Sequence, residues 1–217
     1  MRSSLRLAFA AAITLSAAAP SVAMAQRSHV SAFGGEPLPQ GTNLLHAQFG
    51  WPGLSATFLT GATPKGSFGG RFTFNYGFEG LITGVNLGLK FQGLVRLGLI
   101  DNARVNLGLE LAPGLALYFP GGGAVTQVGI TVPVAFILGI PVSDALAVHV
   151  ILEVPSLVTF TGYSTFYIPI YMGGGLEYAL DKSLMLTLAL RMGPMIDARI
   201  GRSNLGMEAL FGLAFRL

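Results

Sequence analysis

The segment from Gly84 to Leu99 alternates apolar and polar residues almost without interruption. Its apolar positions are Val85, Leu87, Leu89, Phe91, Val95, Leu97 and Leu99. Between them stand Asn86, Gly88, Lys90, Gln92, Leu94, Arg96 and Gly98. Successive side chains of a strand point to opposite faces, so such a strand has one apolar face and one polar, charged face. Similar segments recur to the C-terminus, and no amphipathic helix stands between them to cover the apolar faces. If the sheet closes on itself, its polar faces line the interior and its apolar faces contact lipid, so each face has a suitable environment. The pattern therefore predicts an all-β transmembrane barrel.

The first 25 residues have the features of a secretory signal peptide. A basic start carrying Arg2 and Arg6 precedes an apolar stretch, residues 7–19, that is too short to span a bilayer. Ala23 and Ala25 then form a small-residue cleavage site. We therefore predict that residues 1–25 are a cleaved signal peptide; an uncleaved membrane anchor is the alternative. Export followed by a barrel predicts the outer membrane of a Gram-negative cell.

The composition excludes several classes of function. Once Arg2 and Arg6 leave with the signal peptide, the 13 Lys and Arg residues fall to 11 against 10 acids, so the high pI is no evidence for a nucleic-acid partner. The absence of cysteine excludes disulfides and thiolate metal sites. Beyond the signal peptide no run of about eighteen apolar residues suggests a membrane helix. Because metal-ligand spacings and phosphate-binding loops are also missing, we expect no cofactor.

The remaining chain is predicted to form one barrel, residues 43–217, after a flexible periplasmic lead-in at residues 26–42. Short polar turns near residues 62–65, 101–102, 141–144 and 181–182 alternate with glycine- and aromatic-rich turns near 76–80, 118–123, 160–163 and 200–203. Two alternating kinds of turn indicate an up-and-down antiparallel barrel, whose two rims face different compartments. The ten predicted strands are 43–50, 54–61, 67–78, 84–99, 103–118, 123–140, 145–160, 164–180, 183–198 and 204–217. Eight strands are the alternative, if residues 43–61 are irregular.

Prolines interrupt several of the predicted strands. Because proline lacks the N–H that a ladder requires, we expect the pairing to loosen or bulge towards the outer rim. The five prolines are Pro113, Pro133, Pro155, Pro169 and Pro194.

The last strand carries a recognisable terminal pattern. Gly212 is followed three and five residues later by Phe215 and Leu217 at the chain end. This resembles the C-terminal signal of outer-membrane barrels, and the chain as a whole is similar to the small barrels of the outer-membrane protein A and X type. The resemblance implies that the barrel-assembly machinery recognises these three residues. That family usually ends on Phe or Trp, where this chain has leucine.

The polar faces of the predicted strands supply a charge network for the lumen. Six cations against five anions are nearly balanced, and isolated charges in a confined interior are costly, so we expect them to pair and largely fill the lumen. A narrow conducting lumen is the alternative. The predicted network is Arg71, Lys90, Arg96, Arg104, Glu110, Glu153, Glu177, Arg191, Asp197, Glu208 and Arg216.

The sequence favours a structural role over a catalytic one. Ten-stranded outer-membrane proteases use Asp and His at the outer rim, but His149 lies near a periplasmic turn, which leaves His46 with Asp197 as the one loosely plausible pair. We therefore expect no enzyme, and a monomeric envelope component whose partners are outer-membrane lipid and the assembly machinery. The alternatives are a small porin-like channel for small or hydrophobic solutes, an outer-membrane hydrolase and a soluble β-sandwich or lipocalin-like carrier.

Overall fold

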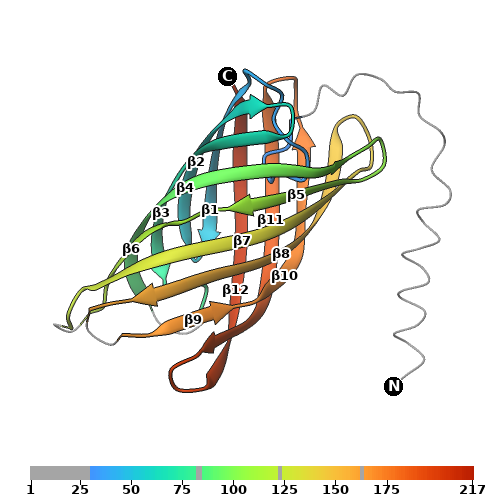
Figure 1. The fold of residues 1–217 in the computed structure, drawn as a ribbon. Coiled ribbons are helices and arrows are strands. Elements are labelled where there is room, and N and C mark those ends of the chain that lie inside the picture. The colour runs from blue at the N-terminus through green and yellow to red at the C-terminus, as the bar shows by residue number, and fades with distance from the viewer. Residues whose placement is uncertain (1–29, 82–84, 122–123, 162–163) are drawn as a thin grey trace, which may run out of the picture.

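The computed structural model describes residues 30–81, 85–121, 124–161 and 164–217, so the predicted signal peptide and its cleavage site lie outside the described residues. The described residues form a single sheet of antiparallel strands (Figure 1). They include no helix long and apolar enough to cross a membrane. The strands are β1 (Asn43–Trp51), β2 (Gly53–Thr63), β3 (Gly66–Gly77), β4 (Val85–Asp101), β5 (Asn106–Leu111), β6 (Gly114–Phe119), β7 (Gln127–Pro141), β8 (Leu146–Thr159), β9 (Phe166–Pro169), β10 (Tyr171–Ala179), β11 (Leu184–Asp197) and β12 (Arg202–Arg216).

The sheet closes on itself because the first and last strands pair. β1 lies antiparallel to β12, with Leu44 opposite Arg216 and Trp51 opposite Ala209. On its other side β1 pairs with β2, and the ring continues through each neighbouring strand in sequence order. The all-β barrel class predicted from the sequence is thus confirmed. The eight-strand alternative is excluded, because β1 and β2 are paired strands joined by a tight turn at Pro52.

Twelve strands stand where the sequence predicts ten, because two of the predicted strands are broken. β5 and β6 flank Ala112 and Pro113, and both pair with β4 on one side and β7 on the other. β9 and β10 flank Ile170, and both pair with β8 and β11. Each broken pair therefore occupies one position around the barrel.

The prolines within the strands lie close to prolines of the neighbouring strands, across the sheet. Pro133 of β7 lies directly opposite Pro155 of β8, and the Pro133 carbonyl accepts the N–H of Ala112 beside Pro113. The Pro194 carbonyl accepts the N–H of Ile170, next to Pro169. Because a proline donates no ladder hydrogen bond, both strand breaks lie where prolines interrupt the pairing.

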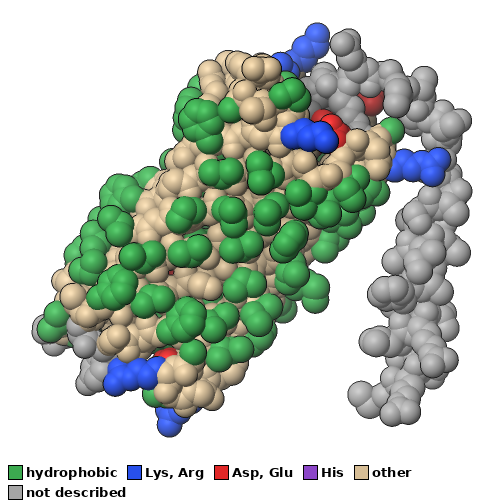
Figure 2. Space-filling model, in the orientation of Figure 1, with side chains coloured by type: hydrophobic (Ala, Val, Ile, Leu, Met, Phe, Trp, Pro, Cys, Tyr) green, Lys and Arg blue, Asp and Glu red, His purple; other side chains and the backbone are tan. Residues whose placement is uncertain are grey.

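The exterior of the barrel is apolar. Along β7, Val128, Ile130, Val132, Phe136 and Ile140 are exposed, whereas every second residue from Gly129 to Gly139 is buried. Figure 2 shows hydrophobic side chains over the wall of the barrel and charged side chains only near its two ends. A closed sheet with this exterior leaves no unpaired edge and exposes a surface suited to lipid, which defines a transmembrane barrel. The soluble carrier would require the apolar face inside, so that alternative is excluded.

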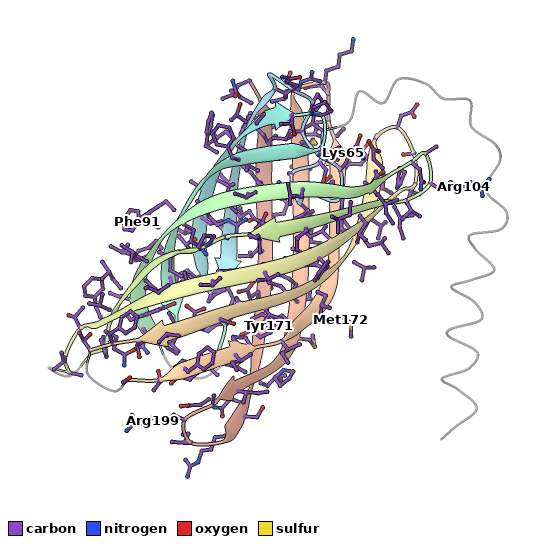
Figure 3. All side chains as sticks on the ribbon, viewed as in Figure 1. Lys65, Phe91, Arg104, Tyr171, Met172 and Arg199 are labelled. Atoms are coloured by element: carbon purple, nitrogen blue, oxygen red, sulfur yellow. The ribbon has the colours of Figure 1, made fainter. Side chains whose placement is uncertain are left out.

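The two rims differ. The terminal rim holds both ends of the barrel, where the N–H of Leu217 donates to the carbonyl of Asn43 (2.9 Å), together with the short polar turns. The far rim holds the Pro52 turn, the longer connections β3–β4, β6–β7 and β8–β9, and the β11–β12 turn, which is as short as most turns of the terminal rim. Figure 3 shows Lys65 and Arg104 near one end and Arg199 near the other, with Phe91 pointing away from the wall.

The predicted lead-in takes a different course from the one that the sequence suggests. Residues 30–33 and Leu38 are buried, and Val30, Ala32 and Leu38 pack against Leu44 and Leu59 of the lumen wall. In place of a flexible segment, residues 30–38 form part of the interior. The apolar side chains of this segment find buried partners there, which offsets the entropy cost of ordering it.

Candidate functional site: a filled lumen with a central chamber

The N-terminal segment is held in the lumen by Glu177 of β10. One carboxylate oxygen of Glu177 accepts the backbone N–H of Phe33 (2.6 Å) and the hydroxyl of Ser31 (3.1 Å). Ser31 in turn accepts the N–H of Gly34 (3.0 Å), and Arg96 donates to the carbonyl of Ala32 (2.8 Å). These charge-assisted bonds satisfy backbone groups that would otherwise be buried without partners.

Glycines of the wall make room for this segment. A Cβ added at Gly108 would lie 2.0 Å from the carbonyl oxygen of Gly34, and one added at Gly175 would lie 2.9 Å from the Phe33 ring. Gly139 similarly approaches Gly35. The glycines of the inner wall thus accommodate residues 33–35 of the chain itself.

Both histidines of the barrel contact the N-terminal segment. His46 shares a hydrogen bond with Thr187 (2.9 Å), and His149 lies 3.2 Å from the second oxygen of Glu177. The Phe33 ring packs edge-on against both imidazoles, at centroid distances of 5.9 and 5.3 Å. His46 is therefore engaged deep in the lumen, whereas Asp197, its suggested catalytic partner, accepts the backbone N–H of Arg199 at the far rim (3.0 Å).

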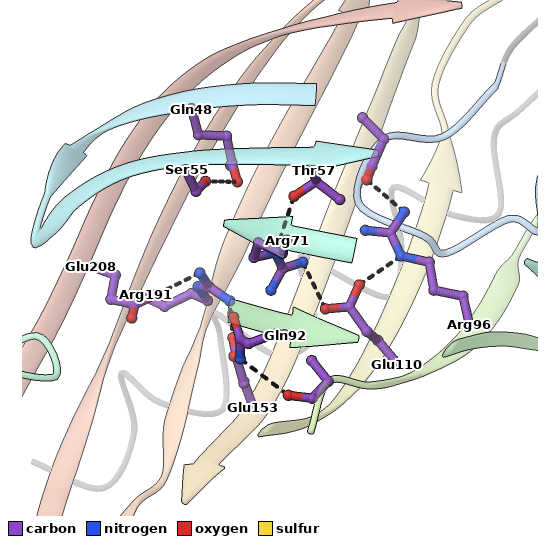
Figure 4. Close-up of polar contacts among 12 residues, drawn as sticks. Gln48, Ser55, Thr57, Arg71, Gln92, Arg96, Glu110, Glu153, Arg191 and Glu208 are labelled. Carbon is purple, nitrogen blue, oxygen red and sulfur yellow. Dashed lines mark hydrogen bonds and ion pairs between the residues drawn. The ribbon is translucent and has the colours of Figure 1, made fainter. Parts of the chain in front are cut away.

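A first charge cluster is centred on Glu110 of β5 (Figure 4). One carboxylate oxygen of Glu110 pairs with Arg71 of β3 (2.8 Å) and the other with Arg96 of β4 (2.6 Å). Arg71 also donates to the hydroxyl of Thr57 (3.1 Å). Two guanidinium groups thus share one buried carboxylate, and the cluster carries a net charge of one positive unit.

A second charge cluster is centred on Arg191 of β11, which contacts two carboxylates. One guanidinium nitrogen pairs with Glu153 of β8 and the other with Glu208 of β12 (2.5 Å). Glu208 lies directly opposite Arg191 in the register of β11 and β12. This cluster carries one net negative unit.

A third group narrows the lumen towards the far rim, and its central residue, Glu79, is not part of the predicted charge network. Glu79, in the β3–β4 connection, is 2% exposed and has a positive φ of 44°. Its carboxylate pairs with Lys90 (3.2 Å) and accepts the hydroxyl of Tyr118, while its carbonyl accepts the hydroxyl of Tyr171. Glu79 belongs to the aromatic turn recognised in the sequence, but no local pattern indicates that the turn folds inward.

The predicted network residues divide into two sets. The structure brings together in lumenal ion pairs Arg71, Lys90, Arg96, Glu110, Glu153, Arg191 and Glu208. Glu177 also lies in the lumen, in contact with His149 and with the backbone of Phe33. Arg104 and Arg216 are instead exposed at the terminal rim, because they lie at or beyond the ends of their strands. Asp197 is buried but stabilises the β11–β12 turn through the N–H of Arg199.

The three residues of the C-terminal pattern lie on β12 or just beyond it. Gly212 faces inward, where an added Cβ would lie 2.6 Å from the Thr187 hydroxyl. Phe215 and Leu217 are exposed, by 39% and 68%. Two apolar side chains are therefore exposed on the outer surface at the end of β12.

Between these groups lies a chamber of about 90 Å³. Both charge clusters line it, together with Ala32 and Phe33 of the N-terminal segment. Arg71, Arg191 and Glu208 keep 15–19% of their side-chain surface exposed. The lumen is thus largely filled, but its charges still contact solvent. Among the described residues there is no group of three or more His, Cys, Asp or Glu that could hold a metal ion.

The chain matches no protein-family model, and no curated protein matches it in sequence. Among solved structures it is similar to the outer-membrane protease OmpT from Escherichia coli, with a TM-score of 0.37 and 7% identity over 81% of this chain and 90% of that one. It is also similar to the outer-membrane channel DcaP of Acinetobacter baumannii, with a TM-score of 0.21 and 10% identity over 82% of this chain and 96% of that one. At these scores the likeness shows neither activity nor substrate.

One expectation is corrected by this comparison. The sequence predicts that the chain is not an enzyme, with an outer-membrane hydrolase as an alternative, whereas the first of these two structures is a protease. The prediction of no enzyme is withdrawn, because a barrel of this general kind does not by itself argue against catalysis.

Proposed function

We propose that the protein is an outer-membrane β-barrel of a Gram-negative envelope, a monomeric structural component whose lumen is closed to ions. Three features support the proposal. The wall is apolar outside, the sequence begins with a predicted signal peptide, and the last strand ends in a pattern similar to the assembly signal of such barrels. Pairing of every strand on both sides leaves no sheet edge that a second copy would need to cover.

The proposal of a closed lumen rests mainly on the position of residues 30–38. This segment lies inside the barrel, anchored at Phe33 by Glu177 and at Ala32 by Arg96. The Glu79 group narrows the lumen nearer the far rim. An ion crossing the barrel would have to displace buried, hydrogen-bonded backbone, which is costly.

Single-channel recording in a planar bilayer tests the proposal. The chain from Gln26 to Leu217, refolded and inserted, is expected to show no discrete conductance steps. Gly108→Ala is expected to produce steps, because its Cβ would clash with the Gly34 carbonyl and displace the segment. Gly93→Ala is the matched control, since the nearest atom to its added Cβ is 4.0 Å away.

The results separate the proposal from its alternative. Reproducible steps of one size from the unmodified chain would refute the closed lumen. They would favour a small channel, the second candidate function, for which the solvent-contacting charges of the chamber are the supporting observation. If Gly108→Ala inserts as a folded barrel and stays silent, the segment is not what closes the lumen.

The C-terminal residues provide a separate test of assembly. If the assembly machinery recognises the last strand, Phe215→Ser should reduce insertion into the outer membrane while leaving refolding in detergent intact. Leu45→Ser is the control, because Leu45 is equally exposed (39%) and lies opposite Phe215 on β1. Equal losses for the two variants would indicate only a loss of lipid contact.

A further inference from the structure

The two charge clusters of the chamber have opposite net charges. On one wall, Arg71 and Arg96 share Glu110, which leaves one positive charge without its own carboxylate among the described residues. On another wall, Glu153 and Glu208 share Arg191, which leaves one negative charge without its own cation in the same part of the chain. The Lys90–Glu79 pair is balanced and adds to neither excess.

The clusters lie on separated arcs of the barrel. The positive cluster is built on β3, β4 and β5, and the negative one on β8, β11 and β12. On one side of the ring β7 separates them, and on the other β1 and β2 do. Figure 4 shows both clusters pointing into the same interior space. All six side chains line the chamber.

We infer that the chamber binds a small zwitterion, with its anionic group at the Arg71–Arg96 cluster and its cationic group at the Glu153–Glu208 cluster. Such a ligand supplies to each cluster the charge that it lacks. A simple anion would meet the Glu153–Glu208 excess, and a simple cation would meet the Arg71–Arg96 excess. Each would therefore bind less well than a molecule that carries both charges.

The size of the chamber limits the ligand. A water molecule requires roughly 10–15 Å³ of such space, so about 90 Å³ corresponds to between six and nine water-sized positions. A small amino acid such as alanine, with about six heavy atoms, is of this size. Larger solutes would require movement of the N-terminal segment or of the Glu79 group.

Two substitutions remove the excess charges without leaving a buried ion unpaired. Arg71→Gln leaves Glu110 paired with Arg96, and Glu208→Gln leaves Arg191 paired with Glu153. Arg104→Gln is the control, because Arg104 is an exposed cation at the terminal rim. All three variants are expected to refold, which heat-modifiable gel migration checks before binding is measured.

Isothermal titration of the refolded chain from Gln26 with alanine tests the inference, with acetate, methylammonium and their mixture as comparison ligands. Alanine is expected to bind more tightly than either ion or the mixture. Arg71→Gln and Glu208→Gln should each weaken alanine by about tenfold, the effect of losing one charge-assisted contact. Arg104→Gln should leave its affinity unchanged.

Three results would overturn the inference: no alanine binding to the folded barrel, binding no tighter than the acetate–methylammonium mixture, or equal affinity in the chamber variants and the control. Binding does not depend on whether the lumen conducts. A conducting barrel that still prefers alanine would refute the proposed closed lumen and leave this inference intact.

Discussion

Removing the carboxylate of Glu110 is the perturbation that most directly probes the charged interior. Glu110→Gln would leave Arg71 and Arg96 facing each other without an anion between them. Arg96 is only 4% exposed and would keep one bond, to the carbonyl of Ala32. Arg71 has 19% of its side-chain surface exposed and keeps Thr57, so solvent and that hydroxyl moderate its share of the loss.

The magnitude follows from this asymmetry. Breaking a buried ion pair by removing one partner costs about 3–5 kcal/mol, and most of that cost falls on Arg96. Arg71→Gln is the matched comparison, because Glu110 keeps Arg96; its cost should be about 1 kcal/mol. The order of the two variants, with Glu110→Gln the more destabilising, is the core of the prediction.

Urea unfolding of the barrel in lipid vesicles measures the loss of stability in both variants. The chain has a single tryptophan, Trp51 at the far rim, whose fluorescence reports unfolding. With a denaturant slope of about 2 kcal/mol per molar, Glu110→Gln should lower the midpoint by about 2 M and Arg71→Gln by about 0.5 M. Equal midpoints for wild type and Glu110→Gln would show that water solvates these arginines fully, and would refute the account of a paired, largely dry interior.

Two further predictions concern the Glu79 group and a turn of the terminal rim. Tyr171→Phe removes the hydroxyl that donates to the Glu79 carbonyl and should lower the free energy of unfolding by about 1 kcal/mol in the same assay. Tyr178→Phe, at an exposed site on the same strand, should cause no measurable loss of stability. Equal losses for the two variants would contradict the role of Glu79. The backbone N–H groups of Ser183 and Leu184 lower the pKa of the exposed Asp181 carboxyl. These bonds stabilise the β10–β11 turn above the ordinary aspartate pKa and are lost as pH falls through the lowered value. The protection of the Ser183 and Leu184 amides, measured as exchange relative to the intrinsic rate at each pH, should therefore fall on acidification but stay unchanged in Asp181→Asn.

Much of the barrel could be read from the sequence because its determinants are local. Alternation along β4 fixes which side chains face lipid, and polar turns such as Asp181-Lys182 mark where strands end. These signals depend on residues within a few positions of one another. They also place most charges of the lumen on the inward face.

The strand breaks were only partly foreseeable. Pro113 predicts a local loss of pairing from the sequence alone. That Pro133 lies directly opposite Pro155 depends instead on the register of β7 and β8. Register is set by contacts across strands far apart in the sequence. The sequence alone therefore indicates weak points without showing that they align.

The occupancy of the lumen was decided by tertiary structure alone. Residues 30–42 are polar, glycine- and proline-containing and without a period, which locally resembles a flexible linker. What orders them is Glu177, about 144 residues away, and the space left by Gly108 and Gly175. Likewise, sequence alternation shows that Arg71, Arg96 and Glu110 face inward, but the register of β3, β4 and β5, with Arg96 opposite Glu110, makes two arginines share one carboxylate. The periodicity of the chain thus determines a barrel with a polar interior, whereas strand register and long-range contacts determine what fills that interior and where its charge remains unbalanced.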